Sequence, residues 1–250
     1  MKIGVSTLAL FPMNFEEILN YLEQINVEYC EIIKEYPYEC VDYKLVNSYN
    51  FKTSVHAPLS DLNIASLNET IRKASVREVK ESMDLASKIG SDVVVVHPGQ
   101  MAFLTRKFKT QIMDMALKSL YECSKYAEEL GLKMSVENMP DMECMICKDL
   151  DELHELTGKI DSSITLDVGH AHNMGYSIHE MLKYDNIGHI HLSDNDGSFD
   201  NHDAIGSKNI DFKTLFNELK GINFDGVCVI EVKKRDEILK SLDYIKNLII

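Results

Sequence analysis

Eight short runs of apolar, mostly β-branched residues recur along the 250-residue chain, and longer amphipathic stretches lie between them. This alternation is typical of strand–helix units repeated around a parallel sheet, and the runs are apolar on both faces, as buried parallel strands require. Eight units suit a (β/α)8 TIM barrel, which typically takes about 250 residues. We therefore predict an α/β fold with a single barrel domain over residues 1–250. The runs begin at Lys2, Tyr29, Lys52, Asp92, Lys133, Ser162, Ile187 and Gly226.

Several connections from an expected helix to the next run are short and contain glycine. Gly90, Gly131 and Gly226 precede the fourth, fifth and eighth runs, and we expect each to end a helix in the left-handed conformation that glycine tolerates. A doubly wound open sheet is the alternative fold. Its nucleotide-binding fingerprints, G-x-G-x-x-G and G-x-x-x-x-G-K-[ST], follow none of the runs, so the barrel is favoured.

Metal-binding residue types stand at the ends of six consecutive runs, from the third to the eighth. The active site of a TIM barrel is built at the carboxyl ends of its strands, so we expect these side chains to meet. Burying a carboxylate or an imidazole alone costs on the order of several kcal/mol, and a shared metal ion provides the missing partner. Imidazoles and carboxylates without a thiolate suit divalent ions such as Zn, Mn or Fe; we expect one to three ions, with Zn or Mn as the best fit. The strand-end residues are His56, His97, Glu137, Asp167, His191 and Glu231, with His170 three positions after Asp167.

The loop after the seventh run is rich in Asp and Asn. Asp200 and His202 lie two residues apart in it, and together with His170 they could chelate one further ion. A polar turn is the alternative explanation, because Asp and Asn are common in turns. The position of the loop on the expected catalytic face favours the metal-binding interpretation.

Seven short motifs follow one another in order along essentially the whole chain: SVHAP, VVHPG, SVENM, LDVGHA, HIHLSDNDG, DNHDAIG and VIEVK. With these motifs the chain resembles the xylose-isomerase-like TIM-barrel superfamily (AP endonuclease family 2), which contains endonuclease IV and many sugar-phosphate isomerases and epimerases. For the endonuclease IV branch the resemblance implies three zinc ions. For the isomerase and epimerase branch it implies one ion, which corresponds to the second of those three. The implied ligands are His56, His97 and Glu137 for the first ion, Glu137, Asp167, His191 and Glu231 for the second, and His170, Asp200 and His202 for the third.

Two enzymatic functions compete. The leading interpretation is a divalent-metal-dependent isomerase or epimerase that acts on a small sugar or sugar phosphate through a metal-stabilised enediolate, with Glu137 and Glu231 moving the proton from opposite faces. The alternative is an endonuclease IV-like, metal-dependent phosphodiesterase that acts at abasic sites in DNA. The loops after Pro12 and Pro37 are short for a DNA-repair member, which favours a small ligand. A barrel that only senses a sugar would leave the paired carboxylates unexplained.

Basic residues near two strand ends are candidates for binding a substrate phosphate. Lys233 follows the eighth run, and Arg106 and Lys107 follow the fourth. Solvated charge is an equally good explanation for all three. His189 lies two positions before His191 and should face the same side one layer deeper, so we expect it to be a buried core histidine.

The charge balance is acidic, with 26 Lys and Arg residues against 40 Asp and Glu residues and a formal net charge of −14. Such a charge disfavours attraction to DNA backbones and anionic membranes. We find neither a secretory signal pattern nor an apolar stretch approaching about 18 residues, so we expect a cytoplasmic protein with no membrane partner. We expect the six cysteines to be free thiols, because they are scattered through a chain too large to need disulfides. The C-x-x-C spacing of Cys144 and Cys147 lacks a second pair, which disfavours a zinc or redox site there. The sequence leaves the oligomeric state open.

Overall fold

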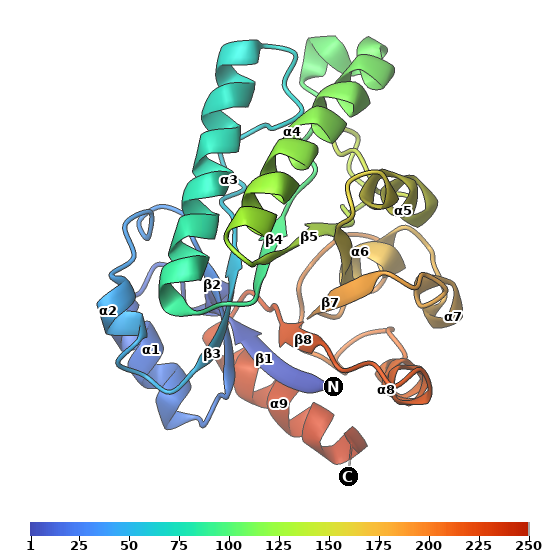
Figure 1. Cartoon of the computed structure of the whole chain (residues 1–250). Coiled ribbons are helices and arrows are strands. Elements are labelled where there is room, and N and C mark those ends of the chain that lie inside the picture. Colours follow the sequence, from blue (N-terminus) through green and yellow to red (C-terminus); the bar gives the residue numbers. More distant parts are fainter. Residues whose placement is uncertain (250) are drawn as a thin grey trace.

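A computed structural model describes residues 1–249 and has eight parallel strands that close into a barrel in sequence order (Figure 1). Each strand pairs with the next one along the chain, and β8 pairs with β1 to complete the ring. The predicted α/β barrel is confirmed. Its extent as one domain over residues 1–250 stays a prediction, because residue 250 lies outside the described part. The strands are β1 (Lys2–Ser6), β2 (Tyr29–Ile33), β3 (Lys52–His56), β4 (Val93–Val96), β5 (Lys133–Glu137), β6 (Ser163–Asp167), β7 (Ile187–Leu192) and β8 (Val227–Ile230).

The helices lie around the outside of the barrel, and α1 (Phe15–Gln24) shows why such segments are helical. The side chain of Asn14 accepts hydrogen bonds from the backbone N–H groups of Glu16 and Glu17, which caps the first turn. Ile18 and Leu22 are fully buried on the opposite side from the exposed acidic residues. The other helices are η1 (Thr7–Leu10), α2 (Tyr43–Val46), α3 (Glu69–Ile89), η2 (Phe103–Phe108), α4 (Lys109–Glu129), α5 (Leu150–Gly158), α6 (Val168–Asn173), α7 (Ile178–Met181), α8 (Phe212–Gly221) and α9 (Arg235–Ile249).

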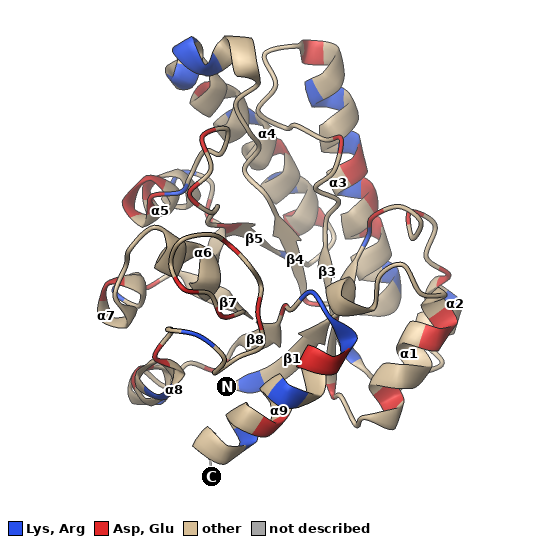
Figure 2. Ribbon diagram, turned by 180° about the vertical axis from the view of Figure 1, so that it is seen from behind, with Lys and Arg blue, Asp and Glu red and all other residues tan. Residues whose placement is uncertain are grey.

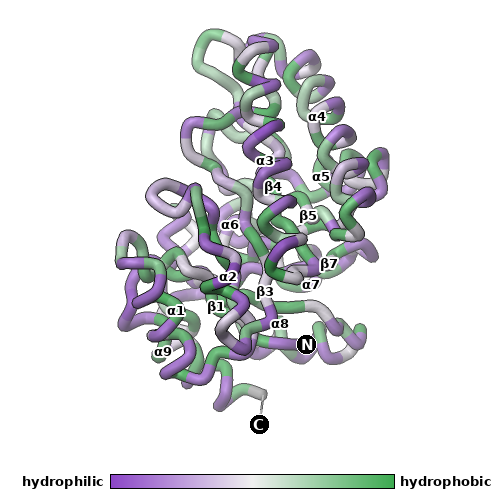
Figure 3. Tube along the Cα trace, turned by 60° about the vertical axis from the view of Figure 1, so that its left-hand side comes forward, coloured by the Kyte–Doolittle hydropathy of each residue, from purple (hydrophilic) through white to green (hydrophobic). Residues whose placement is uncertain are grey.

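Charge and hydropathy follow the same division between inside and outside. Acidic and basic residues are interspersed along the outer helices α3 and α9 (Figure 2). Hydrophilic and hydrophobic stretches alternate along α3 and α4 (Figure 3), as expected for helices that bury one face. Among residues 1–249, none of the helices combines the length and the apolar character needed to span a membrane.

The inside of the barrel is polar, which differs from the expectation of runs that are apolar on both faces. Successive residues of a strand point to opposite faces, so Val55 and Ile190 join the apolar layer beneath the helices while their neighbours face the barrel axis. The interior side chains bond to one another; for example, Thr165 donates a 2.7 Å hydrogen bond to Ser135. The buried polar residues of this interior layer include Glu31, Ser54, Ser135, Thr165 and His189.

The sixth run contains a strand and the start of a helix. Strand β6 ends at Asp167, and α6 begins at once with Val168. The Asp167 carboxylate accepts a 2.7 Å hydrogen bond from the backbone N–H of His170 and so caps this helix. One side chain therefore ends a strand, begins a helix and faces the mouth of the barrel.

Two of the three predicted helix-ending glycines are confirmed. Gly90 and Gly131 have φ values of 69° and 71°, in the left-handed region. The expectation for Gly226 is wrong, because Asn223 takes the left-handed conformation after α8, with φ 54°. Asparagine tolerates this region better than most residues. Gly226 is instead required by space, since a Cβ atom there would lie 2.8 Å from the carbonyl oxygen of Gly188 and would overlap the ring of Phe224.

Gly226→Ala should therefore lower the free energy of unfolding by about 1–3 kcal/mol, the usual cost of overpacking. Gly221→Ala is the matched control, because a Cβ atom at the end of α8 meets nothing within 4 Å and the backbone there has no positive φ. We expect this control to change stability by less than about 0.5 kcal/mol. Urea unfolding followed by circular dichroism measures both, and equal stability of the two variants would contradict the steric role of Gly226.

Candidate active site

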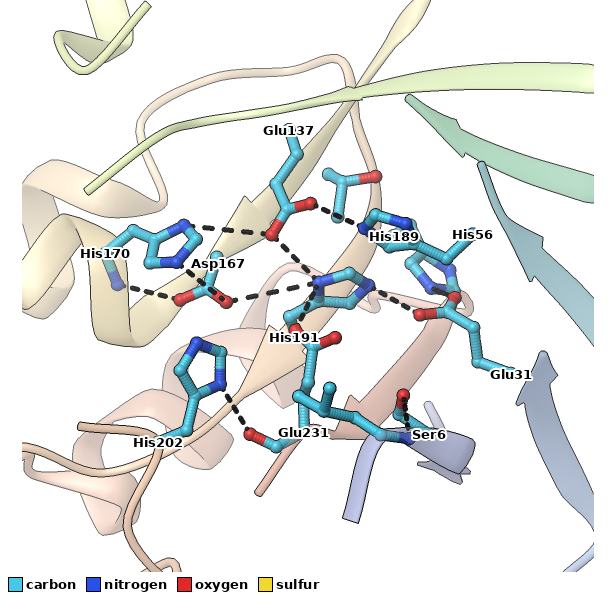
Figure 4. Close-up of polar contacts among 12 residues, drawn as sticks. Ser6, Glu31, His56, Glu137, Asp167, His170, His189, His191, His202 and Glu231 are labelled. Carbon is cyan, nitrogen blue, oxygen red and sulfur yellow. Dashed lines mark hydrogen bonds and ion pairs between the residues drawn. The ribbon is translucent and has the colours of Figure 1, made fainter. Parts of the chain in front are cut away.

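The nine predicted metal ligands gather near the carboxyl ends of the strands. Figure 4 shows His191 among the carboxylates of Glu137, Asp167 and Glu231. The nine residues form three groups, and in each group one ligand atom per residue lies within 4.8 Å of the others. The first and second groups share Glu137. The first group is His56, His97 and Glu137; the second, called the central group below, is Glu137, Asp167, His191 and Glu231; the third is His170, Asp200 and His202.

Glu137 connects two groups because its two carboxylate oxygens face different imidazoles. Oε2 lies 3.2 Å from Nε2 of His56 and 3.0 Å from Nε2 of His97. Oε1 lies 3.0 Å from Nδ1 of His191. The side chain is only 1% exposed, so the charge of this carboxylate is balanced by its neighbours and not by water. A carboxylate in this arrangement can bridge two cations.

The central group takes its side chains from three strands, β5 to β7, and from Glu231, the residue directly after β8. Nδ1 of His191 lies 3.1 Å from Oε2 of Glu231 and 4.0 Å from Oδ2 of Asp167. Within residues 1–249, Oδ2 of Asp167 is buried and has no hydrogen-bond partner. An orphaned acceptor on a buried carboxylate calls for an explanation, and a cation held between Asp167, Glu137, His191 and Glu231 provides one. The donor set of three carboxylates and one imidazole fits a divalent ion.

The third group lies between α6 and the loop that follows β7. Oδ2 of Asp200 lies 3.3 Å from Nε2 of His170 and 2.9 Å from Nε2 of His202. His202 has a φ of 47°, an uncommon backbone conformation for a residue with a side chain. Strained backbone of this kind occurs frequently at ligand-binding sites.

Three of the histidines are oriented by backbone carbonyl oxygens. Nδ1 of His56, His170 and His202 lies 2.7–2.8 Å from the carbonyl oxygens of Ala57, Asn138 and Glu231, respectively. A proton on Nδ1 would satisfy each carbonyl and leave Nε2 to face the carboxylates. This is the usual arrangement of metal-ligating histidines, which donate the second ring N–H to an outer partner.

Buried carboxylates change the pKa values of the surrounding histidines. Burial by itself lowers the pKa of an imidazole, but Glu137 raises the pKa of His56 to about 9. Asp167 and Asp200 likewise outweigh burial and raise the pKa of His170 to about 10, and Asp200 and Glu231 raise that of His202 to about 9. In the protein without bound cations these imidazoles therefore hold protons at neutral pH and balance the carboxylates.

For one carboxylate of the central group, burial outweighs the neighbouring charges. It raises the pKa of Asp167 to about 6, although the nearby His170 and His202 act to lower that pKa. The pKa of Glu137 lies well below its ordinary value, because His191 and His97 outweigh the effect of burial. The two carboxylates thus differ in acidity even though they belong to one group.

Glu31 is a site residue that the sequence analysis missed. It lies in the interior of the barrel on β2, is 0% exposed, and places Oε1 2.9 Å from Nε2 of His191. Its Oε2 lies 2.8 Å from Nε2 of His189, which is buried as predicted. An acidic residue inside an otherwise apolar run, YCEII, was the available signal.

The two basic candidates for phosphate binding differ in their surroundings. Lys233 donates a 3.2 Å hydrogen bond from Nζ to the carbonyl oxygen of Asp200, which puts its charge beside the third group. Arg106 lies on η2 and forms an ion pair with Glu143. Of the two, Lys233 is therefore the one that lies next to a residue of the nine-ligand set.

Comparisons with known proteins show the family and the fold of the chain. The model of the xylose isomerase-like TIM-barrel family matches residues 19–248. An uncharacterized protein of Methanocaldococcus jannaschii is 35% identical over 260 residues, which cover 99% of this chain and 89% of that protein. The crystal structure of a D-tagatose 3-epimerase-like protein has a TM-score of 0.91 at 32% identity and covers 100% of this chain and 97% of its own. Fructoselysine 3-epimerase of Escherichia coli O157:H7 is 22% identical over 170 residues, 66% of this chain and 61% of that enzyme.

The raised histidine pKa values predict that Mn²⁺ binding to the metal-free protein releases protons at pH 7. A metal ion needs an unprotonated imidazole nitrogen, so raising the pH from about 6 to about 8 lowers the concentration of protons that compete with the ion for His56, His170 and His202 and should strengthen its binding. Isothermal titration calorimetry in two buffers of different ionisation enthalpy measures the number of protons released. A binding enthalpy that does not depend on the buffer would contradict the prediction.

Proposed function

Since the chain belongs to the xylose isomerase-like TIM-barrel family, we propose that it is a divalent-metal-dependent isomerase or epimerase that acts on a small sugar or sugar phosphate. The observation that carries this proposal is the central group, in which Glu137 and Glu231 approach the same nitrogen of His191 from two different strands. The similarity to a D-tagatose 3-epimerase-like protein over the whole chain supports it. Zn or Mn fits the nitrogen and oxygen donors, and the surrounding group has no thiolate.

The reaction requires a proton to leave one face of a sugar carbon and to return to that carbon or its neighbour. A divalent ion held by the central group would polarise the adjacent carbonyl and hydroxyl groups of the substrate and favour an enediolate. Glu137 and Glu231 have pKa values below the ordinary range, so both are ionised at neutral pH and able to accept a proton. We assign one carboxylate to remove the carbon-bound proton and release it to solvent, while the other takes up a proton from solvent and delivers it from the opposite side.

Substrate binding needs groups beyond these two carboxylates. Lys233 places an ammonium group at the rim of the mouth, where it can pair with a phosphate or hydrogen-bond to a sugar hydroxyl. Arg106 stays a weaker candidate, because Glu143 already pairs with its guanidinium. The net charge of −14 favours a small ligand over a DNA duplex.

A phosphodiesterase that acts at abasic sites in DNA is the second candidate function. The observation in its favour is that the first and third groups are assembled as completely as the central group. A one-ion isomerase does not need His97 or His202 as ligands, whereas a three-ion phosphodiesterase would use both. The complete nine-residue set keeps this function under consideration.

Glu137→Gln and Glu231→Gln should each lower the exchange of a carbon-bound sugar proton with solvent by at least about 10²–10⁴-fold, the usual contribution of a positioned base. Glu155→Gln on the exposed surface of α5 is the control and should behave like the wild type. Nuclear magnetic resonance in D₂O, on a panel of ketoses and ketose phosphates that includes D-tagatose, measures the exchange. Exchange at wild-type rates in either site variant would refute the assigned roles.

His202→Ala should reduce the number of bound ions while the central group keeps its own, because the His202 imidazole is a candidate ligand only in the third group and contacts Glu231 at its backbone carbonyl, not at its carboxylate. Metal analysis of protein purified without a chelator measures the number of bound ions.

A parallel nicking assay on abasic DNA at low salt compares the two functions, since the electrostatic attraction of a protein to a DNA duplex is strongest at low salt. Nicking by the wild type, together with no proton exchange on any sugar, would reverse the order of the two candidates.

A further inference from the structure

Glu31 lies one layer below the central group and has no direct place among its ligands (Figure 4). It is fully buried on β2, and its carboxylate faces β3 and β7 across the interior of the barrel. Moving a carboxylate from water into such a place costs on the order of several kcal/mol unless charged or hydrogen-bonding groups surround it. Packing alone therefore does not explain why a carboxylate is buried at this position.

The two oxygens of Glu31 have different neighbours. Oε2 accepts a 2.8 Å hydrogen bond from Oγ of Ser54 and lies 2.8 Å from Nε2 of His189. The strand register places Ser54 directly beside Glu31, while His189 and His191 lie two residues apart on one face of β7. These contacts fix the carboxylate and leave Oε1 for His191.

His191 has a carboxylate on each side of its ring. Nδ1 faces Glu137 and Glu231 at 3.0 and 3.1 Å, and Nε2 faces Oε1 of Glu31 at 2.9 Å. The contact with Glu31 has the distance of an ion pair without the alignment of an ideal hydrogen bond. Neither of its two atoms bonds to any third group among residues 1–249. A neutral imidazole carries its proton on one nitrogen only; with a cation held on the Nδ1 side by Glu137 and Glu231, that proton would lie on Nε2, facing the fixed carboxylate of Glu31.

We propose that Glu31 is a positioning residue for the central group, and that it holds His191 with the proton on Nε2 and the lone pair of Nδ1 directed at Glu137 and Glu231. This inference rests on the proposed function, because it assumes that the central group binds a divalent ion. His56, His170 and His202 are oriented by backbone carbonyls; His191 is oriented by a charged side chain. A carboxylate in that position also makes the histidine a stronger ligand.

The same atoms suggest a competing role. Glu31, His189 and His191 have ligand atoms within 4.8 Å of one another and could hold a cation themselves. In that case the ring of His191 would contact one ion with each nitrogen, and neither nitrogen would carry a proton. The two roles therefore differ in the protonation of Nε2 and in the number of bound ions.

The test compares Mn²⁺ affinity in the wild type, Glu31→Gln and Glu31→Asp by competition with a chelator. Outer partners of metal-ligating histidines contribute about 10–100-fold to metal affinity, so we expect Glu31→Gln to lose this factor at the tightest site without a change in the number of ions bound. Glu31→Asp keeps the charge but withdraws it by one methylene group, and its loss should be intermediate. If Glu31→Gln does not fold, Glu31→Asp alone carries the test.

Ser135→Ala is the matched control, because it removes a buried hydrogen bond from the same interior layer without touching Glu31 or His191. It should lower thermal stability and leave Mn²⁺ affinity unchanged. Side-chain ¹⁵N spectra of the Zn²⁺-bound protein add a direct readout: Nε2 of His191 should carry a proton in the wild type, and its signal should shift or broaden in Glu31→Gln.

Each result decides a different question. Wild-type affinity in Glu31→Gln, or a fall in affinity equal to that of Ser135→Ala, would overturn the positioning role and leave the proposed function intact. Loss of exactly one ion, with an unprotonated Nε2 in the wild type, would replace the positioning role with a cation site. A wild-type protein that binds no divalent ion would overturn the proposed function as well.

Discussion

The mutual neutralisation of carboxylates and imidazoles inside the barrel is the interaction on which the rest of the site depends. Glu137, Asp167 and Glu231 are nearly or fully buried, and His191 is in contact with all three. No apolar barrel interior could hold such charges separately. The raised pKa values of His56 and His191 and the lowered pKa of Glu137 are two consequences of the same attraction. Protons and divalent ions are therefore alternative ways to balance one cluster of negative charge.

The barrel and the site residues at the strand ends could be predicted from the sequence because strand ends are visible in it, whereas His170, Asp200 and His202 were found from their spacing and from the family motifs. His56, Glu137 and His191 each follow an apolar run directly, and the barrel topology brings all such ends to one face. The family motifs then assigned each residue to a group. What the motifs could not supply is the geometry, namely that one oxygen of Glu137 faces the first group and the other faces His191.

Glu31 escaped prediction for a physical reason. It lies in the middle of a run, where nothing local indicates which face of the strand is buried against polar groups. Its partner His189 is 158 residues away in the sequence, and their contact depends on barrel closure. Gly226 was misjudged in a similar way, because its need for space comes from the carbonyl oxygen of Gly188 on the neighbouring strand and from the ring of Phe224, and not from a left-handed backbone conformation. Features set by neighbours across the barrel require the structure.

Asp167 has a wider consequence through its double contact. One oxygen holds the backbone N–H of His170 at the first turn of α6, while the other faces the central group. The positive end of the α6 dipole would then attract one oxygen of the Asp167 carboxylate, and a cation in the central group would attract the other. Because α6 also carries His170, the start of this helix cannot shift by a residue without moving a ligand of the third group. Local fraying of six residues would thus disconnect the third group while the eight strands stay closed.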